Sequence, residues 1–150
     1  MILHKEKAPG LLLFTVFVLS FNIARSQSIM ETLKSNRETT HFAQALEEAH
    51  LNTKLGKSGP FTLFAPSNEA FDKLSASQKH NNQLLLNHIF TGLATERSLK
   101  AMADITCLSG KTIKLKNDNG NPISVDSFKI IYANIRADNG VIHVIDGVIK

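Results

Sequence analysis

The chain has 150 residues, of which 43% are hydrophobic and 20% are charged, with a net charge of +4 and a single cysteine. A chain of this length is expected to form one domain with its own core. The charge is too small and too dispersed for a nucleic-acid-binding protein, and a lone cysteine excludes an internal disulfide.

The N-terminal residues have the pattern of an export signal. A basic leader precedes the apolar run of residues 11–21, and Ala24 and Ser26 place small side chains before a cut at Gln27. The run is too short to cross a hydrocarbon core of roughly 30 Å. We therefore predict a signal peptide over residues 1–26, no membrane anchor, and a secreted protein whose single domain spans residues 27–150. A buried N-terminal helix is the alternative.

Two short helices are expected at the start of this domain. Ser28 and Glu31 have the spacing of a capping box, which predicts a helix that reaches about Arg37. Thr39 or Thr40 can cap a second helix, because apolar side chains recur at helical spacing over residues 42–49.

Residues 61–71, with the sequence FTLFAPSNEAF, predict a strand that leads directly into a helix. The strand covers residues 61–65 and ends at Pro66, which has no N–H to donate. Ser67 offers its side-chain oxygen as the N-cap of a helix that reaches Leu74.

Residues 84–90 predict a helix that changes into a strand near His88. Thr95 can cap a further helix that ends near residue 102. From residue 105 onward the pattern is β, with strands expected over residues 112–115, 123–125, 128–133 and 141–145 and a turn over residues 117–122. Helices that come first and strands that follow predict the α+β class.

Two local features of the C-terminal half carry further expectations. The Asn139-Gly140 pair lies between the two long apolar runs and predicts a hairpin, because both residues tolerate positive φ. Cys107 shares a strand face with Ile105 by alternation. Its thiol is therefore either buried and inert or, in the alternative, pairs with a second chain to form a homo-oligomer.

The sequence contains no arrangement of residues that suits catalysis. It has no Gly-x-Ser-x-Gly elbow and no phosphate-binding glycine loop, so we predict no enzymatic activity and no cofactor. His88, His143 and Asp146 are residues of the types that bind zinc. The alternative, which we favour, is that each histidine forms hydrogen bonds within the fold, because neither has a partner at helical ligand spacing.

Residues 61–71 and 139–149 resemble the two signature boxes of the fasciclin domain, and the likeness extends over nearly the whole chain after residue 27. The resemblance implies a wedge of β-strands flanked by helices. It also implies a secreted or tethered module that contacts cell-surface or extracellular-matrix proteins in cell adhesion. A small-molecule or metal carrier that uses a cleft of the same fold is the alternative function.

The resemblance also indicates where a partner would bind. Between the boxes the family has a Tyr-His pair linked to adhesion, and just before the second box it has an Asp-Ile pair that interacts with integrins. The matching residues here, which we predict to bind a partner, are Asn87, His88, Ile89, Phe90, Asn134 and Ile135. Integrin binding is weakened at Asn134, because an amide oxygen brings no charge to a divalent cation.

Overall fold

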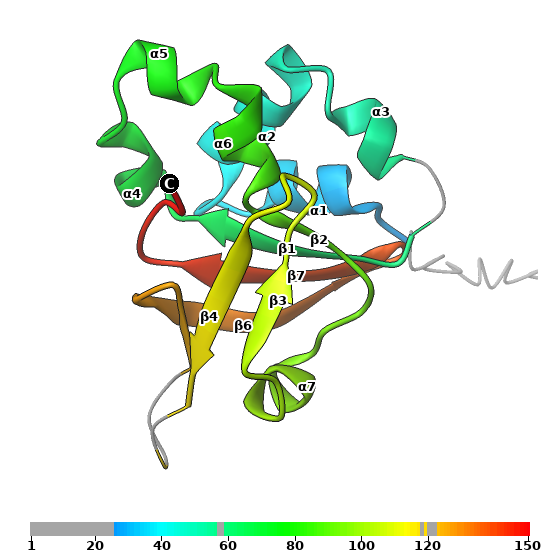
Figure 1. Ribbon diagram of the computed structural model, residues 1–150. Coiled ribbons are helices and arrows are strands. Elements are labelled where there is room, and N and C mark those ends of the chain that lie inside the picture. The colour runs from blue at the N-terminus through cyan, green and yellow to red at the C-terminus, as the bar shows by residue number, and fades with distance from the viewer. Residues whose placement is uncertain (1–25, 57–58, 118, 120–122) are drawn as a thin grey trace, which may run out of the picture.

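The computed structural model describes residues 26–56, 59–117, 119 and 123–150 (Figure 1). The helices in this part of the chain are α1 (Ile29–Ser35), α2 (Thr40–Glu48), α3 (Asn52–Leu55), α4 (Asn68–Asp72), α5 (Ala76–Lys79), α6 (Asn82–Leu86) and α7 (Glu96–Lys100). The strands are β1 (Phe61–Pro66), β2 (Ile89–Thr91), β3 (Asp104–Thr106), β4 (Thr112–Lys116), β5 (Ser124–Val125), β6 (Phe128–Ala137) and β7 (Gly140–Ile145).

One seven-stranded sheet with the order β2-β1-β7-β6-β5-β4-β3 organises the molecule. Figure 1 shows helices α1 to α6 on one side of β1, β7 and β6, while α7 and the strands β3 and β4 lie on the other side. The predicted α+β wedge is therefore confirmed. Strands β1 and β2 nevertheless come before residue 100, and they flank the C-terminal strands because β1 pairs in parallel with β7.

Two hydrophobic cores lie on the two faces of the central strands. The helix-side core contains Leu33, Phe42, Leu63, Leu85 and Ile142, and the strand-side core contains Phe64, Leu99, Ile113, Val125 and Ile145. All residues of β1 and of β7 are buried, because both faces of these strands are covered. Each core thus fixes one side of the β1–β7 pair.

The four predicted helix starts are confirmed, and three of them have the expected capping hydrogen bond. The hydroxyls of Ser28, Ser67 and Thr95 each accept a hydrogen bond from the backbone N–H three residues later. Thr39 precedes α2 but makes no such bond, and its hydroxyl instead donates 2.8 Å to the carbonyl oxygen of Leu33. Thr39 therefore ties α2 to α1 rather than capping α2.

The predicted hairpin at Asn139-Gly140 is confirmed, because β6 and β7 pair in the antiparallel direction, but its turn does not use positive φ. The pairing of Ala137 with Gly140 places Asp138 and Asn139 in the turn, and no residue of this turn has positive φ. A turn with two positive φ values does occur, but between β5 and β6, at Asp126 (51°) and Ser127 (82°).

Gly140 and Asn139 have structural roles that the hairpin pattern does not predict. A Cβ on Gly140 would lie 1.9 Å from the carbonyl oxygen of Phe61, so only glycine allows β7 to approach β1 this closely. The side chain of Asn139 accepts a hydrogen bond of 2.9 Å from Ile29 N–H and donates to the carbonyl oxygen of Leu55. The second signature box thus joins α1, α3, β1 and β7.

Two expectations fall largely on residues that the structure leaves undescribed. The predicted signal peptide lies outside the described residues except for Ser26, and most of the expected turn over residues 117–122 does as well. Within the described residues, no helix has both the length and the hydrophobicity needed to span a membrane.

Candidate functional site

Asn87, His88 and Ile89 lie at the junction of α6 and β2, and all three are buried. The side-chain amide of Asn87 donates a hydrogen bond of 3.1 Å to the carbonyl oxygen of Ile149. Phe90, the next residue, is partly buried and packs against the strand-side core. The first group of predicted contact residues therefore supports the interior of this fold and presents little side-chain surface to a partner.

His88 is held in one neutral tautomer by two backbone groups. Its Nε2 accepts a hydrogen bond of 3.0 Å from Ile149 N–H, so its Nδ1 carries the proton and donates 3.1 Å to the carbonyl oxygen of Leu84. Complete burial lowers the pKa of His88 from 6.5 to about 4. Its ring also contacts the edge of Phe42, with 5.4 Å between the ring centroids.

His143 is buried on the opposite face of the sheet and is held in the same manner. Its Nδ1 accepts a hydrogen bond of 3.2 Å from Asn134 N–H, and its Nε2 therefore donates 2.8 Å to the carbonyl oxygen of Ala94. The ring stacks on Phe64 at 5.7 Å between centroids. Burial is the main reason that the pKa of His143 is lowered.

The residues considered for zinc binding do not form a donor set. Both nitrogens of each imidazole are occupied by backbone groups, and an Asp146 carboxylate oxygen accepts 2.8 Å from Lys129 N–H. Across the residues that the structure describes, no group of three histidine, cysteine or acidic side chains is placed to hold a metal ion.

Asn134 occupies a bulge in β6. The register between β6 and β7 shifts between Tyr132 and Ile135, and Asn134 adopts φ of 58°, a conformation that asparagine tolerates better than most residues. Its Oδ1 accepts a hydrogen bond of 2.9 Å from Glu96 N–H at the start of α7. Asn134 is exposed and Ile135 is half-buried, so this second group of predicted contact residues does reach the surface.

A groove lies beside this part of β6, and we call it the β6 groove. It has a volume of about 560 Å³ and is lined by Asn36, Arg37, Glu38, Ile131, Tyr132, Ala133 and Ile135. Ile131 is 43% exposed and Tyr132 is 54% exposed, although both belong to a run that the sequence predicts as a strand. The two register shifts in β6 explain this exposure, because each adds an unpaired residue and changes the direction of the side chains that follow.

The family model of the fasciclin domain matches residues 37–150 of the chain. The chain belongs to the fasciclin domain family. It is 31% identical over 134 residues to protein sll1483 of Synechocystis sp., with 83% of this chain and 73% of that protein covered. It is 33% identical over 131 residues to human periostin, but the matched part is 81% of this chain and only 16% of periostin.

A solved structure confirms the fold of this fasciclin domain. The FAS1 domain pair of the insect cell adhesion molecule fasciclin I matches with a TM-score of 0.69 at 17% sequence identity, over 83% of this chain and 51% of that one. At this identity the likeness establishes the architecture alone.

The structure does not bring the two predicted groups of contact residues together. Asn87 and His88 hold Ile149, whereas Asn134 and Ile135 lie on the bulged part of β6. Ile131 and Tyr132, which are the most exposed apolar residues near Ile135, were not among the predicted contact residues. An asparagine within an apolar strand pattern was the one local signal, since it favours a bulge with positive φ.

Proposed function

We propose that this fasciclin domain is a secreted, non-enzymatic protein-binding module of cell adhesion or the extracellular matrix, and that it binds its partner through the β6 groove. The observation that carries the proposal is the exposure of Ile131 and Tyr132 beside Ile135. Tyrosine supplies a large apolar area and a hydroxyl that can form hydrogen bonds, and it is enriched among the residues that dominate protein interfaces.

Three further observations support this function. The chain belongs to the fasciclin domain family, and its fold matches that of an insect cell adhesion molecule. The sequence of residues 1–26 has the pattern of an export signal. The chain spans less than a fifth of periostin, so a role like that of the whole periostin protein is a proposal for this chain.

The valency of the domain limits how it acts. A single groove cannot link two surfaces, and adhesion gains its strength from several linked sites. We infer that the domain acts as a competing ligand or as a component of a larger matrix assembly, or that it self-associates.

We further infer that attachment does not depend on divalent cations. An integrin-type contact needs a carboxylate at position 134, whereas Asn134 offers a neutral amide. The amide oxygen already accepts the hydrogen bond from Glu96 N–H. Integrin therefore remains the weaker candidate among the cell-surface partners.

Cell attachment to surfaces coated with the purified protein tests the proposal. The double variant Ile131→Ser/Tyr132→Ser is expected to lose most of the attachment and to keep the free energy of unfolding within about 1 kcal/mol, because both residues are exposed. Leu108→Ser is the matched control, since Leu108 is 39% exposed on the β3–β4 connection, and it should attach cells like the wild type.

Two results would contradict the proposal. One is wild-type attachment no greater than that to an inert protein coat, and the other is full attachment by the double variant. A chelator of divalent cations distinguishes integrin binding, which needs a cation, from the binding proposed here. The chelator should leave wild-type attachment unchanged, and only Asn134→Asp should show attachment that the chelator removes.

A further inference from the structure

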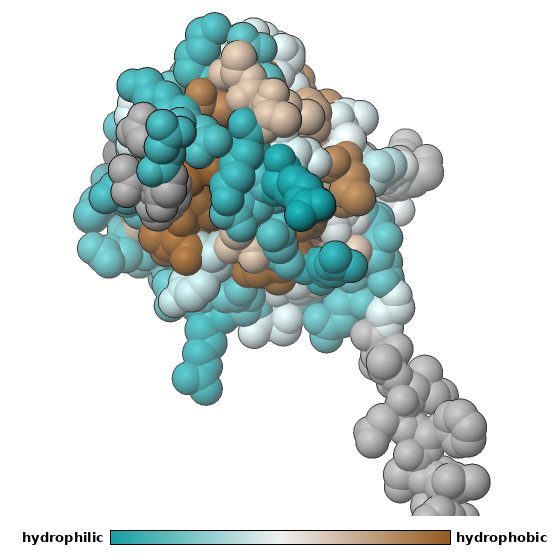
Figure 2. Space-filling view, turned by 90° about the horizontal axis from the view of Figure 1, so that it is seen from below, coloured by the Kyte–Doolittle hydropathy of each residue, from teal (hydrophilic) through white to brown (hydrophobic). Residues whose placement is uncertain are grey.

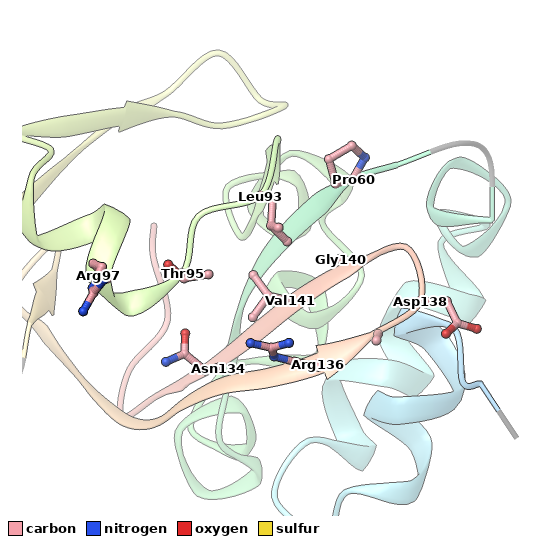
Figure 3. A pocket seen from close by; sticks show the side chains of 10 residues that line it. Pro60, Leu93, Thr95, Arg97, Asn134, Arg136, Asp138, Gly140 and Val141 are labelled. Atoms are coloured by element: carbon pink, nitrogen blue, oxygen red, sulfur yellow. The ribbon is translucent and has the colours of Figure 1, made fainter. Parts of the chain in front are cut away.

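A second hollow lies between the segment that joins β2 to α7 and the adjoining ends of β6 and β7, and we call it the arginine hollow. Its volume is about 520 Å³, within the range of small-molecule sites. Figure 3 shows Leu93 and Thr95 on one side and Asn134 and Arg136 on the other, with Val141 between them. The arginine hollow and the β6 groove share no lining residue.

Two uncompensated positive charges line this hollow. Arg97 and Arg136 are both exposed, and neither guanidinium forms an ion pair with any described residue, whereas neighbouring Lys100 pairs with Glu96. The one acidic side chain in the lining is Asp138, and Figure 3 shows its carboxylate pointing away from Arg136. The lining therefore favours an anion.

Asn134 adds a neutral donor to the two guanidiniums. Its Oδ1 faces Glu96 N–H and accepts the hydrogen bond, so its Nδ2 is the end of the amide that remains available. Figure 3 shows this side chain between Arg97 and Arg136. The Asn134 amide is a poor ligand for a cation, but its free N–H group can donate a hydrogen bond to an oxyanion.

Apolar surface lies next to these donors. Leu93 is 56% exposed, and its side chain lines the hollow together with the partly buried Ala137 and the buried Val141. Figure 2 shows hydrophobic surface in separate patches among hydrophilic side chains on the side of the molecule away from α1 to α6. A ligand that covers Leu93 removes apolar area from water, while its anionic end can pair with arginine in a bidentate manner.

We propose that the arginine hollow binds a small amphipathic carboxylate. Arg136 and Arg97 hold the carboxylate with help from the Asn134 amide, and the hydrocarbon part lies over Leu93. This activity is separate from the proposed protein binding, because it uses other residues and a different class of ligand.

Titration of the isotope-labelled protein with octanoate, followed by backbone amide NMR, tests the proposal. Octanoate should bind saturably and shift the amide signals of residues 93–97 and 134–141. Octan-1-ol, which lacks the charge, and acetate, which lacks the hydrocarbon part, should each bind at least about tenfold more weakly.

Variants assign the binding to the named side chains. Arg136→Gln and Arg97→Gln should each weaken octanoate binding by about tenfold, and Asn134→Asp should weaken it through charge repulsion. Lys129→Gln removes an exposed charge elsewhere on β6 and should bind like the wild type. Equal affinity for octanol or acetate, no saturable octanoate binding, or unchanged binding by Arg136→Gln would overturn the proposal.

Octanoate binding can be tested independently of cell attachment. The variant Ile131→Ser/Tyr132→Ser keeps every residue of the arginine hollow, so it should bind octanoate like the wild type even where it no longer attaches cells. Loss of octanoate binding in that variant would show that the ligand occupies the β6 groove and would also overturn the assignment.

Discussion

His88 accepts a hydrogen bond of 3.0 Å from the backbone N–H of Ile149, which lies 61 positions later in the chain. The amide of the adjacent Asn87 donates 3.1 Å to the carbonyl oxygen of the same residue. Both backbone groups of Ile149, which is fully buried, are therefore satisfied by two neighbouring side chains. The family's Tyr-His position thus fixes the C-terminal residues to the α6–β2 junction in this protein.

The free energy of unfolding is expected to decrease as the pH falls below about 6.5. Burial lowers the pKa of His88 from 6.5 to about 4 and also lowers that of His143. Unfolded chains therefore take up protons at these side chains over a pH range in which folded chains do not, and acid favours unfolding. For His88 alone the loss amounts to about 3 kcal/mol once the pH is below about 4. Urea unfolding at a series of pH values measures this loss of unfolding free energy.

His88→Gln provides the comparison for this pH dependence. The variant should be less stable than the wild type at pH 7, because it loses the ring contact with Phe42 and a fixed hydrogen-bond acceptor. Its stability should nevertheless decrease less steeply between about pH 6.5 and 4, since one titrating group has gone. Parallel curves for the two proteins would show that His88 does not cause the acid sensitivity.

Asn87→Ala is expected to lower the free energy of unfolding by about 1–3 kcal/mol, because it leaves the buried carbonyl oxygen of Ile149 without its side-chain donor. Asn82→Ala is the matched control, since Asn82 is an exposed asparagine in the neighbouring helix and should change stability by less than about 0.5 kcal/mol. Chemical denaturation of the wild type and the two variants measures these differences in the free energy of unfolding. Equal stability of Asn87→Ala and the wild type would mean that water replaces the amide at no cost.

The helix starts could be predicted from the sequence because their causes are local. The hydroxyls of Ser28, Ser67 and Thr95 each act on an N–H only three residues away, so the pattern and the geometry coincide. Thr39 does precede α2, but it makes no capping bond because its hydroxyl donates to a carbonyl oxygen on the preceding helix. A window along the sequence cannot show that this carbonyl oxygen competes with the backbone N–H groups of α2 for the hydroxyl.

The candidate sites depend on contacts that are distant in the sequence. Ile131 and Tyr132 look like residues of a buried strand, and only the loss of register against β7 turns them outward. Arg97 and Arg136 line the same hollow because the link from β2 to α7 passes beside the joined ends of β6 and β7. Neither relationship follows from a periodicity: the first depends on the register between β6 and β7, and the second depends on the path of the link between β2 and α7.

Gly140→Ala is expected to destabilise the protein more than Gly147→Ala. A Cβ at position 140 would meet the backbone oxygen of Phe61 at 1.9 Å, and the backbone of a central strand cannot yield. A Cβ at position 147 would meet the ring of Phe128 at the same distance, but this ring is only half-buried and can rotate outward. We expect a loss above about 3 kcal/mol for the first variant and about 1–3 kcal/mol for the second. Equal losses in urea unfolding would show that β1 and β7 separate easily.

Cys107 is expected to be unreactive in the folded protein and to form no disulfide with a second chain. The side chain is buried, and burial raises the pKa of its thiol from 9.0 to about 12, which leaves about a thousandfold less of the nucleophilic thiolate near neutral pH. A colorimetric thiol reagent should label the native protein at least about a hundredfold more slowly than the urea-unfolded protein. Rapid native labelling, or a dimer on non-reducing gels, would contradict this expectation.

Ser127→Gly is expected to stabilise the protein although it removes a side chain. Ser127 adopts φ of 82° in the two-residue turn between β5 and β6, where glycine avoids the strain that a Cβ causes. The strain energy that glycine removes from the folded state exceeds the entropic cost of its greater freedom in the unfolded chain. The free energy of unfolding should therefore rise by about 0.5–1 kcal/mol. Ser77→Gly, at an exposed position within α5, should instead lower it by about 0.5–1 kcal/mol, because glycine has an entropic cost in helical backbone and loses the hydrogen bond to the Ser75 hydroxyl. Thermal unfolding should therefore show midpoint shifts of opposite sign, and a decrease in both variants would mean that positive φ costs serine little in this turn.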